Sequence, residues 1–114
     1  MSDHPITVEP ARARLRVLWR GRVVADTAHA LVLREASYPA VYYVPREDAD
    51  MALFQRTDRK THCPHKGDAC YFSLVAPDAR AENAVWTYER PFPAVAAIAG
   101  RLAFYPDKVS FEEG

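Results

Sequence analysis

The chain has 114 residues, of which 49% are hydrophobic and 26% charged, and its 15 basic and 15 acidic side chains cancel. These values are typical of one globular domain, and the zero net charge provides no general attraction to nucleic acid or to an anionic membrane. No apolar run approaches the roughly 18 residues that span a bilayer, and the N-terminus lacks a signal-peptide pattern. We therefore expect a small cytoplasmic domain with neither nucleic-acid nor membrane partners.

The N-terminal end lacks hydrophobic periodicity, and we expect residues 1–12 to be a poorly ordered segment ahead of one domain, residues 13–114. Four strands follow, each predicted from period-two alternation or from a short apolar or β-branched run, at residues 15–19, 22–25, 30–33 and 41–44. Arg20-Gly21 is the predicted tight turn between the first two, because glycine tolerates a positive φ.

The second half of the chain mixes short helices with strands. Asp48 is a suitable N-cap for a short helix that ends near Phe54, and residues 55–68, which are polar and irregular, predict a long loop. Pro93 suits the first turn of a second short helix. Four more strands are predicted at residues 70–75, 85–89, 102–105 and 109–111.

Nine prolines and four glycines interrupt the chain often, which favours short strands over long helices. The predicted fold class is therefore mainly β: an antiparallel two-sheet sandwich or open barrel with one or two short helices. The alternation also predicts a set of buried side chains, namely Leu15, Val17, Trp19, Leu31, Leu33, Val41, Tyr43, Leu74, Trp86, Ile98, Leu102 and Phe104.

The segment richest in reactive side chains is residues 61–70, which holds both cysteines and half of the histidines. His62, Cys63, His65 and Cys70 are residue types that bind zinc, but they crowd into nine residues and no second Cys-x-x-Cys exists. We therefore predict no metal and no cofactor, and we expect both cysteines to be free thiols.

Two other kinds of chemistry remain open in this segment. Cys63 is a candidate nucleophile if Lys66 or a nearby histidine lowers the pKa of its thiol. Lys66-Gly67 is a candidate anion-binding pair, because a lysine charge lies beside a glycine N–H, although the order of residues is not that of a P-loop. The alternatives are an unreactive small thiol and a solvated lysine in a tight turn.

Two further groups of residues fit either a site or ordinary structure. Asp48 and Asp50 are candidates for a metal-binding carboxylate pair, yet both also suit the start of a helix. Trp86 and Tyr88 share one face of a predicted strand, and Tyr43 lies on another; such aromatics form either core or the lining of a ligand pocket.

Several motifs occur in a recognisable order: GRVVAD at residues 21–26, VYYVP at 41–45, THCPHKGDACY at 61–71, AVWTY at 84–88 and IAG at 98–100. In this order the chain resembles a family of small bacterial and fungal proteins catalogued as domain of unknown function 427, also labelled nucleotidyltransferase-like. The resemblance implies a compact, β-tent-like domain. It also points to eight positions of the family pattern: Asp48, Cys63, Pro64, Lys66, Gly67, Tyr71, Trp86 and Tyr88.

Together these observations predict a domain that binds a small anionic or planar ligand at the Cys-Pro-x-Lys-Gly loop. The expected ligand-binding residues are Tyr43, Cys63, Lys66, Gly67, Tyr71, Trp86 and Tyr88. One alternative is an enzyme, either a thiol-dependent one that uses Cys63, or one in which Lys66 acts covalently, or a nucleotide-handling transferase. Another is a non-catalytic module that forms homo-oligomers through an exposed sheet edge.

Overall fold

The computed structural model describes residues 5–114. Residues 1–4 of the segment expected to be poorly ordered lie outside the described residues. Over the described residues the chain forms strands at β1 (Ile6–Pro10), β2 (Leu15–Trp19), β3 (Arg22–Thr27), β4 (Leu31–Glu35), β5 (Val41–Tyr43), β6 (Phe54–Cys63), β7 (Gly67–Ala76), β8 (Ala79–Thr87), β9 (Ala103–Phe104) and β10 (Ser110–Glu113). The helices are short 3-10 segments at η1 (Arg46–Asp48), η2 (Met51–Leu53) and η3 (Pro93–Ile98). The mainly-β fold class is confirmed. No helix between residues 5 and 114 is long and apolar enough to cross a membrane.

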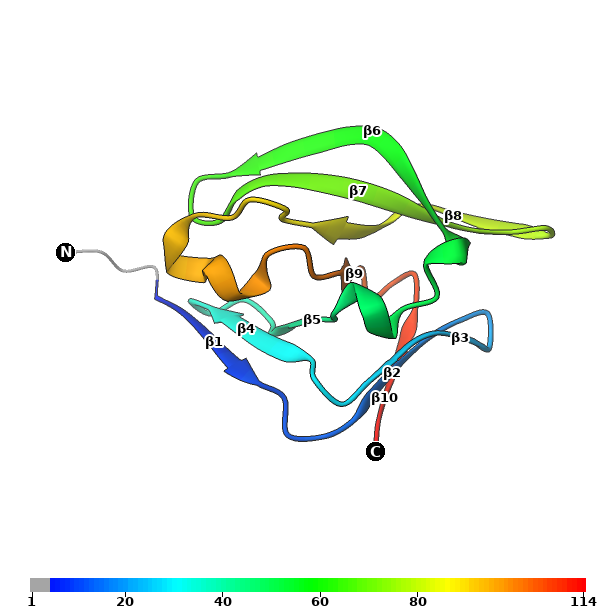
Figure 1. Ribbon diagram of the computed structural model, residues 1–114, viewed down its shortest axis with the longest axis horizontal. Coiled ribbons are helices and arrows are strands. Elements are labelled where there is room, and N and C mark those ends of the chain that lie inside the picture. The colour runs from blue at the N-terminus through cyan, green and yellow to red at the C-terminus, as the bar shows by residue number, and fades with distance from the viewer. Residues whose placement is uncertain (1–4) are drawn as a thin grey trace.

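All strand pairs are antiparallel, and the strands divide among three sheets with the orders β1-β4-β5, β10-β2-β3 and β6-β7-β8-β9. The four-stranded sheet lies above the two smaller sheets in Figure 1. A bridge between Val44 and Leu102, closed by two backbone hydrogen bonds of 2.8 Å, joins β5 to the strand at the edge of the large sheet. Backbone pairing therefore continues in one curved layer from β1 to β6.

Alternation along this layer divides its side chains between two hydrophobic clusters. On β7, Tyr71 belongs to one cluster and Phe72 to the other, and the same division separates Tyr43 from Val44. One cluster includes Leu15 and Val17 of β2 and Val24 of β3. The other lies on the opposite face of the layer and is covered by η3, which contributes Val95 and Ile98.

The predicted turn between β2 and β3 is present. Arg20 and Gly21 have φ values of 54° and 79°, so both central residues of this two-residue turn are in the left-handed region. That geometry matches the right-handed twist of the paired strands, which is why such turns favour glycine. Among the twelve side chains predicted to be buried, nine are, while Leu31, Val41 and Trp86 are half-buried.

Three expectations about local structure are wrong. Residues 6–10 form β1, which pairs with β4, and the alternation of Ile6 and Val8 with polar neighbours is a short strand signal that the sequence analysis missed. Residues 54–63 form the long strand β6 where a loop was expected, because pairing with β7 satisfies the backbone of a polar, exposed segment. The helix expected from residue 48 is two separate 3-10 turns, and Asp50 between them makes no side-chain cap.

Candidate ligand-binding site

One face of the curved layer holds a cavity of about 220 Å³. Its lining comes from alternate positions of several strands together with the turn before β7: Leu33, Glu35, Val41, Tyr43, Lys66, Tyr71, Trp86, Tyr88 and Tyr105. The strand register explains this gathering, since Leu33 lies opposite Val41 and Tyr71 lies opposite Trp86. Residues two apart on one strand face the same side, so β4 supplies Leu33 and Glu35, and β5 supplies Val41 and Tyr43.

Lys66 and Glu35 form an ion pair in the wall of this cavity. The Lys66 Nζ atom donates a hydrogen bond of 2.5 Å to Glu35 Oε1, and the two side chains are only 11% and 14% exposed. The same ammonium lies 5.9 Å from the centroid of the Tyr88 ring, within range of a cation–π interaction. The alternative of a solvated Lys66 is therefore wrong: its charge is buried and balanced by a carboxylate.

The turn that carries Lys66 is fixed by backbone geometry on both sides. The Lys66 carbonyl accepts a 2.9 Å hydrogen bond from the Phe92 N–H, and Gly67 follows with a φ of 116°. A Cβ atom at Gly67 would lie 3.5 Å from the Arg90 carbonyl oxygen, so the space is sufficient and the requirement for glycine comes from φ. Gly67 thus shapes the turn without lining the cavity.

Four phenols and an indole form most of the remaining wall. Burial raises the pKa of Tyr43 to about 12 and also raises that of Tyr88, so both hydroxyls stay protonated at neutral pH. The Trp86 Nε1–H donates to the Tyr43 hydroxyl over 3.4 Å, and the Trp86 ring packs against Tyr105 with centroids 4.6 Å apart. These contacts hold large aromatic surfaces in place around the cavity.

The Tyr71 hydroxyl lies at the centre of a hydrogen-bonded group. It is 2.9 Å from Thr61 Oγ1 and accepts a 3.5 Å bond from Tyr105, while the Arg59 guanidinium lies 5.0 Å from its ring centroid. Burial acts to raise the pKa of Tyr71, but these hydrogen bonds and the Arg59 charge outweigh it and the pKa is lowered. Burial and the contact with Tyr71 raise the pKa of Tyr105 to about 12.

The structure brings most of the predicted site residues together around this cavity. Five of the seven line it: Tyr43, Lys66, Tyr71, Trp86 and Tyr88. Cys63 packs against the same hydrophobic cluster but is not part of the lining. The sequence analysis missed Glu35 and Tyr105, although each lies two residues after a buried residue of the same strand face, Leu33 and Ala103, and that spacing could have placed them.

The other chemistry expected of residues 61–70 finds less support in the geometry. Both cysteines are free thiols. His62, a candidate base for Cys63, is exposed and its Nδ1 atom lies 2.6 Å from the Asp68 carboxylate. No group of three or more His, Cys, Asp or Glu side chains within residues 5–114 is arranged to hold a metal ion.

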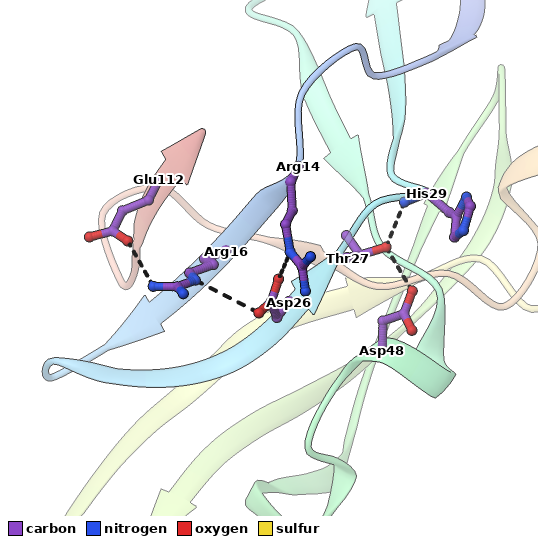
Figure 2. Close-up of polar contacts among 7 residues, drawn as sticks. All are labelled: Arg14, Arg16, Asp26, Thr27, His29, Asp48 and Glu112. Atoms are coloured by element: carbon purple, nitrogen blue, oxygen red, sulfur yellow. Dashed lines mark hydrogen bonds and ion pairs between the residues drawn. The ribbon is translucent and has the colours of Figure 1, made fainter. Parts of the chain in front are cut away.

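The carboxylate pair expected at Asp48 and Asp50 does not converge on one point. The Asp48 carboxylate accepts a 2.7 Å hydrogen bond from the buried hydroxyl of Thr27, which in turn accepts a 2.9 Å bond from the His29 N–H (Figure 2). Asp50 is exposed. Asp48 therefore fastens η1 to the end of β3, a structural role for a residue that the resemblance had highlighted.

A second, more open depression of about 560 Å³ lies beside η1 and the end of η3. Three of its charged residues have hydrogen-bond partners: Arg46 donates 2.6 Å and 2.8 Å bonds to the Gly100 carbonyl and to Glu89, and Arg101 donates a 2.8 Å bond to the His29 carbonyl. Among the described residues, no aromatic side chain lines this larger depression. The smaller cavity around Lys66, which five aromatic side chains line, is the better candidate site.

A family model described as a domain of unknown function, DUF427 (NTP_transf_9), matches residues 7–113. The chain belongs to the DUF427 family. The match begins at the second residue of β1 and ends at the last residue of β10, and it includes every described residue that lines the aromatic cavity. No curated protein matches the chain. DUF427 carries no assigned activity, so the function must be argued from the cavity itself.

Proposed function

We propose that this DUF427 domain binds a small planar molecule in the aromatic cavity. The observation that supports the proposal is the lining: four tyrosines and one tryptophan surround about 220 Å³ of space, with one buried ion pair in the wall. Ligand sites commonly combine apolar and aromatic walls with a few polar groups. Neither expected class of enzyme receives similar support, because Cys63 does not line the cavity and the Asp48 carboxylate is bonded to Thr27.

The volume sets the size of the ligand. An engineered apolar cavity of about 150 Å³ is large enough to bind benzene. The cavity of about 220 Å³ therefore suits one substituted six-membered ring, and it is too small for a nucleotide. Of the two ligand classes that the sequence predicts, the planar one fits these walls, and the Lys66 charge that would attract an anion is already balanced by Glu35.

The proposal is tested by comparing a substitution that fills the cavity with the same substitution on the exposed surface. Val41 lines the cavity, whereas Val23 lies exposed on β3, so Val41→Trp and Val23→Trp form a matched pair. We expect benzamide, as a one-ring probe, to shift the amide and indole NMR signals of Trp86 and its neighbours in the wild type and in Val23→Trp. The Val41→Trp protein should lose these shifts. Equal shifts in both variants, or shifts confined to other parts of the surface, would contradict the proposal.

A further inference from the structure

The ion pair between Lys66 and Glu35 places one positive and one negative charge in the wall of the cavity. One positive and one negative group lie within hydrogen-bond distance, both are nearly buried, and the other lining residues are apolar or are phenols and an indole. Among the lining residues that the structure describes, one positive and one negative side chain therefore oppose each other, and the walls offer both donors and acceptors. An ammonium has three N–H donors and a carboxylate has room for several hydrogen bonds.

A charged ligand would disturb this balance. An anion that bonds to Lys66 would compete with Glu35 and leave a carboxylate poorly compensated in a mostly buried wall, which is unfavourable. The negative faces of the aromatic rings add to this effect. A cation meets the opposite difficulty, because Glu35 already pairs with Lys66 and the ammonium would lie beside the incoming charge.

We infer that the cavity selects an uncharged, single-ring planar ligand whose polar edge both donates and accepts hydrogen bonds, as a ring carboxamide does. This inference rests on the proposed function, since it names the ligand class of the same cavity. In this arrangement the carbonyl of the ligand accepts from Lys66 and its N–H donates to Glu35. Its ring lies against the aromatic walls formed by Trp86 and the tyrosines.

Three probes of nearly equal shape distinguish the effect of ligand charge on affinity from the effect of ligand shape. Benzamide is neutral, benzoate is an anion and benzamidine is a cation, while all three carry one planar substituent on the same ring. We expect wild-type protein to bind benzamide at least about tenfold more tightly than either charged probe, as measured by calorimetry or by NMR titration. Tighter binding of benzoate or benzamidine to the wild type overturns the inference and leaves the proposed function standing.

A conservative substitution should reverse the preference. Glu35→Gln keeps the shape of the side chain but leaves Lys66 unbalanced, so benzoate should gain about tenfold in affinity and bind more tightly than benzamide. Glu9→Gln, which removes an exposed carboxylate from β1, should retain the wild-type order of the three probes. An unchanged order in a folded Glu35→Gln protein contradicts the inference.

The outcomes separate the two proposals. If none of the three probes binds the wild type or Glu35→Gln, the proposed function itself fails, and the inference fails with it. If Glu35→Gln does not fold, as judged by circular dichroism, the ranking of the three probes on the wild type decides alone. The exposed-carboxylate control shows that any change of order arises at the cavity and not from the net charge of the protein.

Discussion

Lys66 and Glu35 are 31 positions apart in the chain, yet they form the most enclosed ion pair of the described residues. Exposed ion pairs contribute little to stability because water and salt screen them. A nearly buried pair behaves differently, since removing one partner leaves an uncompensated charge and costs about 3–5 kcal/mol. The pair therefore constrains both the stability of the cavity wall and the charge of what can bind there.

At the same scale, Tyr43 should make the stability of the protein depend on alkaline pH. Burial raises its pKa from 10.0 to about 12, so the folded state holds the phenolic proton more tightly than the unfolded state. This contribution is fully present below about pH 10 and is lost as the pH rises towards 12, because only the unfolded chain then ionises readily. The free energy of unfolding should fall by about 2–3 kcal/mol through the ionisation of this one tyrosine.

Urea denaturation at several values between pH 8 and pH 12 measures this effect. Tyr43→Phe should lose less stability over that interval than the wild type, because phenylalanine has no proton to release. Tyr38→Phe changes an exposed ring that is 65% accessible and serves as the matched control. Parallel curves for the wild type and Tyr43→Phe would show that Tyr43 is not responsible for the alkaline loss.

At the scale of elements, one side-chain bond joins β3 to η1. The buried Thr27 hydroxyl donates to Asp48 over 2.7 Å (Figure 2). The backbone adds a bond from the Asp50 N–H to the Val24 carbonyl. A hydrogen bond to a charged group contributes about 1.5–3 kcal/mol. Together these contacts hold the connection that leads from β5 into β6, and so help to position one end of the large sheet.

A double-mutant cycle tests this connection. Thr27→Val and Asp48→Ala should each destabilise the protein, and the double variant should be more stable than additivity predicts by about 1–2 kcal/mol. Asp50→Ala removes an exposed carboxylate that makes no capping bond and should change stability by less than about 0.5 kcal/mol. Strict additivity of Thr27→Val and Asp48→Ala would mean that the two side chains do not interact in solution.

At the scale of the whole molecule, two hydrophobic clusters share one curved layer of strands. Neighbouring residues such as Tyr71 and Phe72 belong to different clusters, so neither cluster can come apart without disturbing the strands that carry the other. We therefore expect residues 5–114 to unfold in one cooperative transition, as small single domains usually do.

The two tryptophans report on the two clusters separately. Trp19 belongs to the cluster that contains β2, and Trp86 packs against the cluster that lines the cavity. In Trp19→Phe and Trp86→Phe proteins, the fluorescence of the remaining tryptophan and the far-UV circular dichroism should give coincident urea transitions within each variant. A fluorescence transition that clearly precedes the loss of secondary structure in either variant would indicate two separate folding units.

The amino-acid sequence by itself determined the fold class and predicted five of the residues that line the cavity, because both depend on local patterns. Period-two alternation at residues 15–19 and the Arg20-Gly21 turn predicted a hairpin that the structure contains. The strands predicted at residues 70–75 and 85–89 are consecutive in the chain, and the structure pairs this part of the chain with Trp86 opposite Tyr71. Short-range geometry is enough for such predictions, since strands expose alternate faces and neighbouring strands usually pair.

Only the tertiary structure decided which distant strands pair and which charged side chains form ion pairs. β1 and the polar strand β6 show weak local signals, and they become strands because β4 and β7 satisfy their backbones. The Lys66–Glu35 pair likewise joins the end of β4 to the turn before β7, although β4 and β7 belong to different sheets. No local sequence pattern encodes a contact of this kind. Burial and charge pairing are properties of distant contacts, so a lysine that resembles a solvated turn residue in the sequence becomes a buried, compensated charge in the fold.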